Sequence, residues 1–157
     1  MAGPAIAEGK SCGDCGLCCK LMGVKELAKP QFVWCKQFKR GRGCQIYEDR
    51  PTTCGEFVCY WLHAPSLGDD WRPDRAGFLM TLAEGGRRLD VEVEPATPSA
   101  WRREPYLSAI RGWAAQGAAS GLTLRVWVGR RGYEVTSDGE VDLGLARPAS
   151  ARGSRPR

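Results

Sequence analysis

The sequence predicts an α+β fold in two parts: an irregular cysteine-rich module, then a β-β-α-β-β antiparallel sheet with one covering helix. Three observations lead to this prediction. All eight cysteines of the 157-residue chain lie between Cys12 and Cys59. Apolar and polar residues alternate over 89–94 and again over 122–128, as they do in half-buried strands. Between these two stretches, apolar residues recur at helical spacing over 106–117.

The C-terminal part contains the clearest elements. An apolar strand over Gly77–Glu84 and the alternating strand over 89–94 should form a hairpin around the turn at Gly85-Gly86. A helix is expected to begin at Pro105 and to end before Gly121. Further strands are expected over 122–128 and through 133–135, with a short fifth strand at 141–143.

Composition divides the chain into four segments. Residues 1–10 read as a flexible lead-in, 11–66 as the cysteine-cluster module, 67–145 as the α+β portion and 146–157 as a disordered basic tail. Glycine and cysteine interrupt every periodic run in the module. Short helices are expected there over Lys20–Ala28 and from Pro51 to His63, the second capped by Thr52 or Thr53.

The first residues and the absence of a long apolar run bear on location. No run of 18 apolar residues occurs, which predicts no membrane span, and the start lacks the apolar segment of a secretory signal. We therefore expect a cytoplasmic protein with reduced thiols. In that compartment dense cysteine more often indicates metal than disulfides.

The charge balance gives little support to a nucleic-acid partner. The chain carries 23 Lys and Arg against 18 Asp and Glu, a formal net charge of +5. Eight thiolates on two divalent ions would add −8 + 4 = −4, which leaves about +1. A zinc module that binds nucleic acid through Lys36–Arg42 and the basic tail is therefore a minor alternative.

The stretch CGDCGLCC places Cys12, Cys15 and Cys18 on one tight loop, which Gly13 and Gly16 allow to curl. Iron–sulfur proteins use this C-x-x-C-x-x-C spacing, and zinc knuckles also use C-x-x-C. The later cysteines form no second C-x-x-C, which favours an iron–sulfur cluster or a compact two-metal site over structural zinc alone. The predicted metal ligands are Cys12, Cys15, Cys18, Cys19, Cys35, Cys44, Cys54 and Cys59.

Two details of the cysteine pattern leave alternatives open. The side chains of the adjacent Cys18 and Cys19 should point in different directions, so they face two sites, or one ligates while the other packs. His63 would share a helical face with Cys59 and could be a further ligand, or it is a partly buried ring at a helix end. Buried free thiols and a disulfide scaffold are the alternatives to metal binding.

These residues resemble a known family. CGDCGLCC, Cys35 and GRGCQIYEDRPTTCGEFVCYW (Gly41–Trp61) are similar to the CxxCxxCC, or YkgJ-type, cysteine-cluster family of bacterial proteins. The resemblance spans about residues 11–80, with all eight cysteine positions filled and RPDRAG (Arg72–Gly77) following. It implies a zinc- or iron-chelating domain. Non-cysteine positions that match are Ile46, Tyr47, Arg50, Pro51 and Phe57.

Metal binding is thus the expected function, with iron (as an iron–sulfur cluster) or zinc as cofactor and no catalytic residues assigned. The principal alternative is a cluster-dependent redox or transferase enzyme, because a related cysteine cluster occurs in bacterial proteins that methylate flagellin lysines. Against it, no glycine-rich nucleotide loop follows a strand. A hydrolase is disfavoured because His63, the single histidine, lies in the cysteine module.

Overall fold

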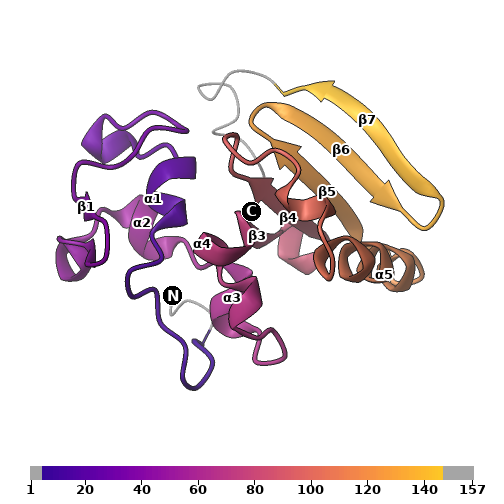
Figure 1. Cartoon of the computed structure of the whole chain (residues 1–157), viewed down its shortest axis with the longest axis horizontal. Helices are drawn as coiled ribbons and strands as arrows, with labels where there is room; N and C mark the ends of the chain where they lie inside the picture. The colour runs from indigo at the N-terminus through magenta and orange to yellow at the C-terminus, as the bar shows by residue number, and fades with distance from the viewer. Residues whose placement is uncertain (1–4, 147–157) are drawn as a thin grey trace. The chain divides into compact units, whose positions relative to one another are not determined.

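The computed structural model describes residues 5–146, and the chain divides after Leu79 into two compact units (Figure 1). The fold is mixed α+β, with a two-stranded sheet in the first unit and a five-stranded sheet formed by the later strands. The α+β class predicted from the sequence is confirmed. The expected basic tail lies outside the described residues except for Ala146, as do the first four residues of the lead-in.

Short elements joined by turns make up the first unit. No helix in its described residues exceeds five residues. In chain order the elements are α1 (Leu17–Leu21), η1 (Lys25–Leu27), β1 (Phe38–Lys39), β2 (Gly43–Cys44), η2 (Tyr47–Asp49), α2 (Thr52–Glu56), α3 (Tyr60–His63), η3 (Asp69–Trp71) and α4 (Pro73–Ala76).

Both helices expected in the cysteine module need correction. The helix expected over Lys20–Ala28 was wrong: α1 begins after the left-handed Gly16 and ends at Leu21, since Met22 is extended. A bridge between Val24 and Lys29 then closes the following loop around η1. The single helix expected up to His63 is two helices, α2 and α3, with an extended connection between them.

The expected threonine cap is also wrong. Pro51 occupies the N-cap of α2, and no side chain caps this helix. Thr53 instead contacts the loop around η1. Its backbone N–H donates to Glu26 Oε2 at 3.2 Å, and its hydroxyl donates to Glu26 Oε1 at 2.7 Å. These two bonds tie α2 to η1.

A small apolar core supports the first unit. Leu17 and Leu21 of α1 pack with Leu79, and Phe32 and Phe57 pack against these leucines. Cys15 and Cys18 contact the same core. Core packing therefore fixes one end of the cysteine loop.

The second sheet follows the order β3-β4-β5-β6-β7. The Gly85-Gly86 turn is part of η4, between β3 and β4. The fifth strand has seven residues and is longer than expected. The elements are β3 (Phe78–Ala83), η4 (Glu84–Gly86), β4 (Arg88–Val93), η5 (Ala100–Arg102), α5 (Tyr106–Ala118), β5 (Thr123–Val128), β6 (Arg131–Thr136) and β7 (Gly139–Leu145).

The prediction of a wholly antiparallel sheet was wrong at one strand pair. Strands β4 and β5 run parallel, with Leu89 opposite Leu124 and Val91 opposite Val126. Helix α5 lies between them in the chain and returns it to the same end of the sheet, which is the connection that parallel neighbours require. The pairs β5–β6 and β6–β7 are antiparallel. Helix α5 packs on β5 and β6 (Figure 1).

The face of β4 opposite Leu89 and Val91 carries a buried ionic group. Asp90 of β4 is 2% exposed and accepts hydrogen bonds from Arg88 and from the indole N–H of Trp127. Arg88 also donates to Glu84 at 2.6 Å. Each buried charge thus has hydrogen-bonded partners that offset the free-energy cost of its burial.

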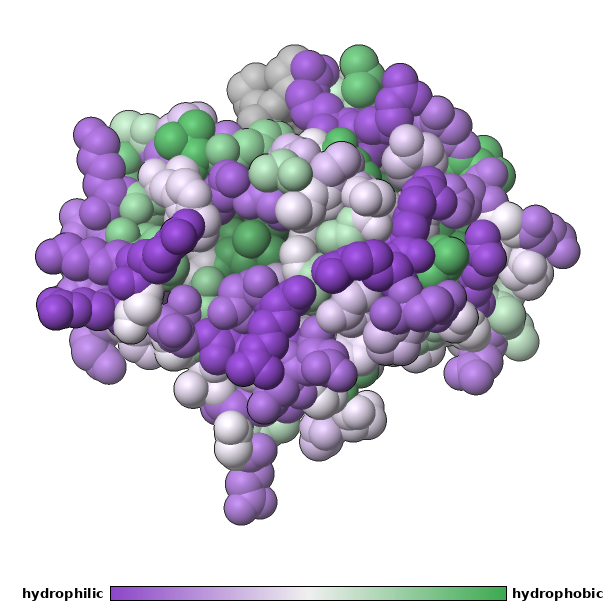
Figure 2. All heavy atoms as spheres, in the orientation of Figure 1, coloured by the Kyte–Doolittle hydropathy of each residue, from purple (hydrophilic) through white to green (hydrophobic). Residues whose placement is uncertain are grey.

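Figure 2 shows one face of the molecule, where hydrophilic side chains predominate and apolar side chains form small separate groups. Over the described residues, no helix combines the length and the apolar character needed to cross a membrane.

Candidate metal centre

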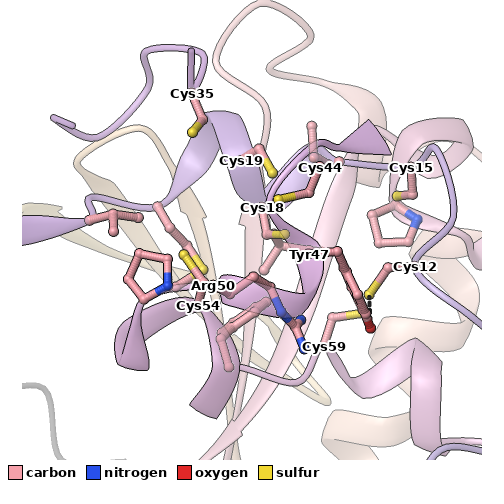
Figure 3. Close-up of a pocket in the computed structure, with 18 of the residues that line it drawn as sticks. Cys12, Cys15, Cys18, Cys19, Cys35, Cys44, Tyr47, Arg50, Cys54 and Cys59 are labelled. Carbon is pink, nitrogen blue, oxygen red and sulfur yellow. Dashed lines mark hydrogen bonds between the residues drawn. The ribbon is translucent and has the colours of Figure 1, made fainter. Parts of the chain in front are cut away.

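All eight cysteines line one pocket of the first unit (Figure 3). The pocket is partly open to solvent, and all of its lining residues lie between Cys12 and Leu79. All eight side chains are free thiols. Folding thus gathers sulfur atoms from α1, α2 and the connecting loops around one cavity.

The Cys12–Cys18 loop curls as its glycines predicted. Cys15 N–H donates to the Cys12 carbonyl at 3.0 Å, closing a turn. Gly13 and Gly16 have φ angles of 49° and 61°, in the left-handed region that favours glycine. Gly16 is also enclosed, because a Cβ there would overlap the ring of Phe38.

The β1–β2 hairpin brings later cysteines to the end of α1. Cys35 N–H donates to the Cys19 carbonyl at 3.0 Å, and Phe38 N–H donates to the Cys35 carbonyl at 3.1 Å. Phe38 in turn pairs with Cys44 across the hairpin. The Cys35 sulfur accepts the backbone N–H of Gln37 at 3.4 Å. Such N–H groups stabilise negative charge on sulfur.

Gly43 allows this hairpin to lie against the first cysteine loop. Its φ is 81°, and a Cβ there would overlap the Gly13 carbonyl oxygen. Only glycine permits so close an approach of two backbones. The two loops that carry five of the cysteines are held together at this point.

Cys59 occupies the N-cap of α3 and is 9% exposed. The chain that enters the first cysteine loop lies beside the same helix, because the Lys10 ammonium donates to the carbonyls of Trp61, Ala64 and Leu67. Lys10 thereby holds the segment leading to Cys12 against the helix that begins after Cys59.

A buried lysine also lines the pocket. Lys29 is 8% exposed, and its ammonium donates to the carbonyls of Lys20, Met22 and Pro30. Burial lowers the pKa of Lys29, while the nearby Cys35 and Cys19 thiols oppose that shift. Sequence reasoning missed this residue, because a single lysine before a proline has no spacing that links it to a site.

Arg50 and Tyr47 also belong to the polar lining of the pocket. The Arg50 guanidinium lies 3.8 Å from the centre of the Tyr47 ring, and the Tyr47 hydroxyl lies 4.0 Å from the Cys12 sulfur. The hydrogen bond from Cys18, together with the positive charges of Lys29 and Arg50, lowers the pKa of Cys19 to about 7 despite burial. The Cys19 thiol is therefore readily ionised near neutral pH.

Burial has the opposite effect on several other thiols. It raises the pKa of Cys59 to about 11 and raises the pKa values of Cys15, Cys44 and Cys54. The pKa of Cys18 is raised well above its usual range, first because Cys18 donates its proton to the Cys19 sulfur. An ion with a high affinity for sulfur would therefore displace protons as it binds.

The pocket collects the thiols without fixing them at bonding distance. Within residues 5–146, no three His, Cys, Asp or Glu side chains stand close enough to hold a metal ion as they are. In the described part of the chain, the pocket lining does not include His63, whose ring packs edge-on against Tyr60. Since Cys59 precedes α3, the expected helical pair of Cys59 and His63 does not form.

Comparisons with protein-family models, with curated proteins and with solved structures find no match to this chain. The resemblance to the CxxCxxCC family therefore stays a prediction based on the residues themselves.

Proposed function

We propose that this protein binds metal through its clustered cysteine thiolates, either iron in an iron–sulfur cluster or zinc. One observation carries the proposal: eight cysteines spread over residues 12–59 all line the same pocket. Thiolates are the ligands that zinc and iron–sulfur clusters most often have in proteins. The similarity of the cysteine spacing to a family of zinc- or iron-chelating domains points to the same chemistry.

The other lining residues suit a negatively charged centre. A divalent ion bound by four thiolates has a net charge of −2, which is costly in an enclosed pocket unless cations offset it. Lys29 and Arg50 supply positive charge beside Cys19. We place the protein in a reducing compartment such as the cytoplasm, where thiols stay available for metal.

Binding requires the thiols to move closer together than they stand in this structure. One torsion angle, χ1 about the Cα–Cβ bond, sets the position of a cysteine sulfur. Changes between staggered χ1 rotamers can therefore redirect the sulfurs while the backbone stays in place. The metal–thiolate bonds release far more free energy than such rotations cost, since apparent values for structural zinc reach roughly 10–16 kcal/mol.

Anaerobic purification followed by visible absorption and elemental analysis tests the proposal. A brown protein with comparable iron and sulfide identifies an iron–sulfur cluster, and a colourless protein with stoichiometric zinc identifies a thiolate zinc site. The double variant Cys15→Ser/Cys54→Ser serves as a control and should lose metal. Substoichiometric metal in the wild-type protein, with no effect of chelators on its folding, would overturn the proposal.

A further inference from the structure

We propose that the eight cysteines form two separate four-thiol sites, each of which holds one metal centre. The loop set comprises Cys12, Cys15, Cys18 and Cys59, and the hairpin set comprises Cys19, Cys35, Cys44 and Cys54. This division rests on the proposed metal-binding function and adds to it which residues share a centre. Four thiolates are the ligand set of a structural zinc ion or of an iron–sulfur cluster.

Backbone hydrogen bonds join three members of the hairpin set. Cys35 N–H bonds to the Cys19 carbonyl, and Cys35 O accepts from Phe38, which pairs with Cys44 in the hairpin. Cys19, Cys35 and Cys44 are therefore linked through the main chain in three consecutive steps. No rearrangement of the backbone is needed to keep these three cysteines as neighbours.

Cys54 completes the hairpin set from α2. The bonds between Thr53 and Glu26 hold α2 against η1, within the loop that the bridge between Val24 and Lys29 closes. The Lys29 ammonium bonds to the Lys20 carbonyl, directly after Cys19.

The loop set is assembled around the C-x-x-C-x-x-C stretch. Cys12 and Cys15 share a closed turn, and Cys15 and Cys18 both pack on the leucine core of α1. Cys59 reaches this loop because Lys10 holds the segment before Cys12 against α3. Figure 3 shows Cys12 and Cys59 on the same side of the pocket, away from Cys35.

The boundary between the sets falls between Cys18 and Cys19. Consecutive residues of a helix are rotated by about 100°. The Cys18 thiol also donates to the Cys19 sulfur, so the two centres would be adjacent, with one of these two sulfurs in each. These two cysteines lie on α1, where Cys18 packs on the core and Cys19 O is bonded to Cys35. Adjacent cysteines thus allow one short helix to serve two neighbouring centres.

Each set also has its own basic side chain. Lys29 lines the pocket, and its ammonium bonds to the carbonyl of Lys20, directly after Cys19 of the hairpin set. Arg72 lies beside the loop set, where it pairs with Asp14 between Cys12 and Cys15. Two anionic centres in one pocket would repel each other, and separate cations reduce that repulsion.

Metal-dependent protection from alkylation tests the division on the wild-type chain. Reduced metal-free protein is titrated with Zn²⁺, alkylated with N-ethylmaleimide, digested and analysed by mass spectrometry. We expect two zinc ions per chain at saturation. Below saturation, the four cysteines of each set should gain protection together. Protection that groups Cys59 with Cys54, or Cys18 with Cys19, would overturn the division.

Paired variants give a second, independent readout of zinc stoichiometry. Cys12→Ser/Cys15→Ser damages only the loop set and should retain one zinc ion per chain, as should Cys44→Ser/Cys54→Ser. The cross-set variant Cys15→Ser/Cys54→Ser should retain none. If a within-set pair abolishes all binding while the variant stays folded, the cysteines form one joint centre.

The outcomes also separate this inference from the proposed function. A wild-type chain that binds no zinc, iron or sulfide contradicts the proposed function itself. A wild-type chain that binds a single joint centre contradicts only the division into two sets. If a variant does not fold, the alkylation pattern of the wild-type protein still decides.

Discussion

Lys29 shows how one side chain can serve both the fold and the site. Its three carbonyl acceptors belong to residues on both sides of the Val24–Lys29 loop, so the ammonium closes that loop. The same charge lies beside the thiols of Cys19 and Cys35. Removing it would leave buried carbonyls without a donor and thiolates without a counter-charge.

Lys29→Met should lower the free energy of unfolding by about 2–3 kcal/mol, because hydrogen bonds from a charged donor are lost in a buried place. It should also lower the metal content. Urea unfolding and elemental analysis of the protein as isolated measure both effects. Lys36→Met is the matched control, because Lys36 is exposed in the same module. Equal effects of the two substitutions would contradict the role of Lys29.

Alanine substitutions at two glycines of the β1–β2 hairpin distinguish the cost of backbone strain from the cost of steric overlap. Gly41 and Gly43 have similar φ angles, 77° and 81°, but a Cβ on Gly41 meets nothing within 4 Å. Gly41→Ala should therefore cost about 1 kcal/mol from the left-handed conformation alone. Gly43→Ala should cost about 3 kcal/mol or more, because it also pushes the hairpin away from the Gly13 carbonyl.

Urea unfolding of the two alanine variants gives this difference directly. Metal content should fall in Gly43→Ala and stay at the wild-type level in Gly41→Ala. Equal free energies of unfolding for the two variants would show that moving the hairpin away from the first cysteine loop costs no stability.

At the scale of elements, β4 combines a buried apolar face with a buried ionic one. Arg88→Met removes the partner of Asp90, which would then be a buried carboxylate without its counter-ion. We expect a loss of about 3–5 kcal/mol in the free energy of unfolding. Arg131→Met on β6 removes the exposed pair with Asp142 of β7 and should cost less than about 1 kcal/mol. Denaturant unfolding followed by circular dichroism compares them, and similar midpoints would contradict the prediction.

The strands could be predicted from the sequence, and their partners only in part. Alternation of residues such as Leu89 and Val91 shows which side chains share a face, but it carries no information on strand direction. The parallel pairing of β4 with β5 follows from the path of α5 along the sheet. The alternation within one strand gives no information on that path. The helices of the first unit were misplaced because five residues make little more than one turn, too few for a period to appear.

The candidate site, like the sheet, could be predicted from the sequence only in part. Cysteine and glycine spacing was enough to predict the turn that joins Cys12 and Cys15, since the constraint is local. Cys18, expected on the same loop, lies on α1. The approach of Cys54 and Cys59 depends on contacts such as Glu26 with Thr53 and Lys10 with α3, which join residues far apart in the sequence. Those contacts use common polar residues that no motif distinguishes.

At the scale of the whole molecule, metal removal should affect the two units unequally. A chelator under reducing conditions should decrease protection from hydrogen exchange in the first unit, including the Cys35 amide, because little regular structure supports it. Amides of β5 and β6 should keep their protection. Cys15→Ser and Cys54→Ser should give the same pattern in milder form.

Restoring zinc or iron should restore the protection of the first unit, which controls for irreversible damage by the chelator. Loss of protection throughout the described chain would show that the two units unfold as one cooperative structure.

The pocket is lined only by residues up to Leu79. Chains are synthesised from the N-terminus at about 5–20 residues per second, and N-terminal units fold first. Every lining residue has therefore been incorporated before the ribosome begins β4. A nascent chain can thus begin to acquire its metal while later strands of the second sheet are still being synthesised.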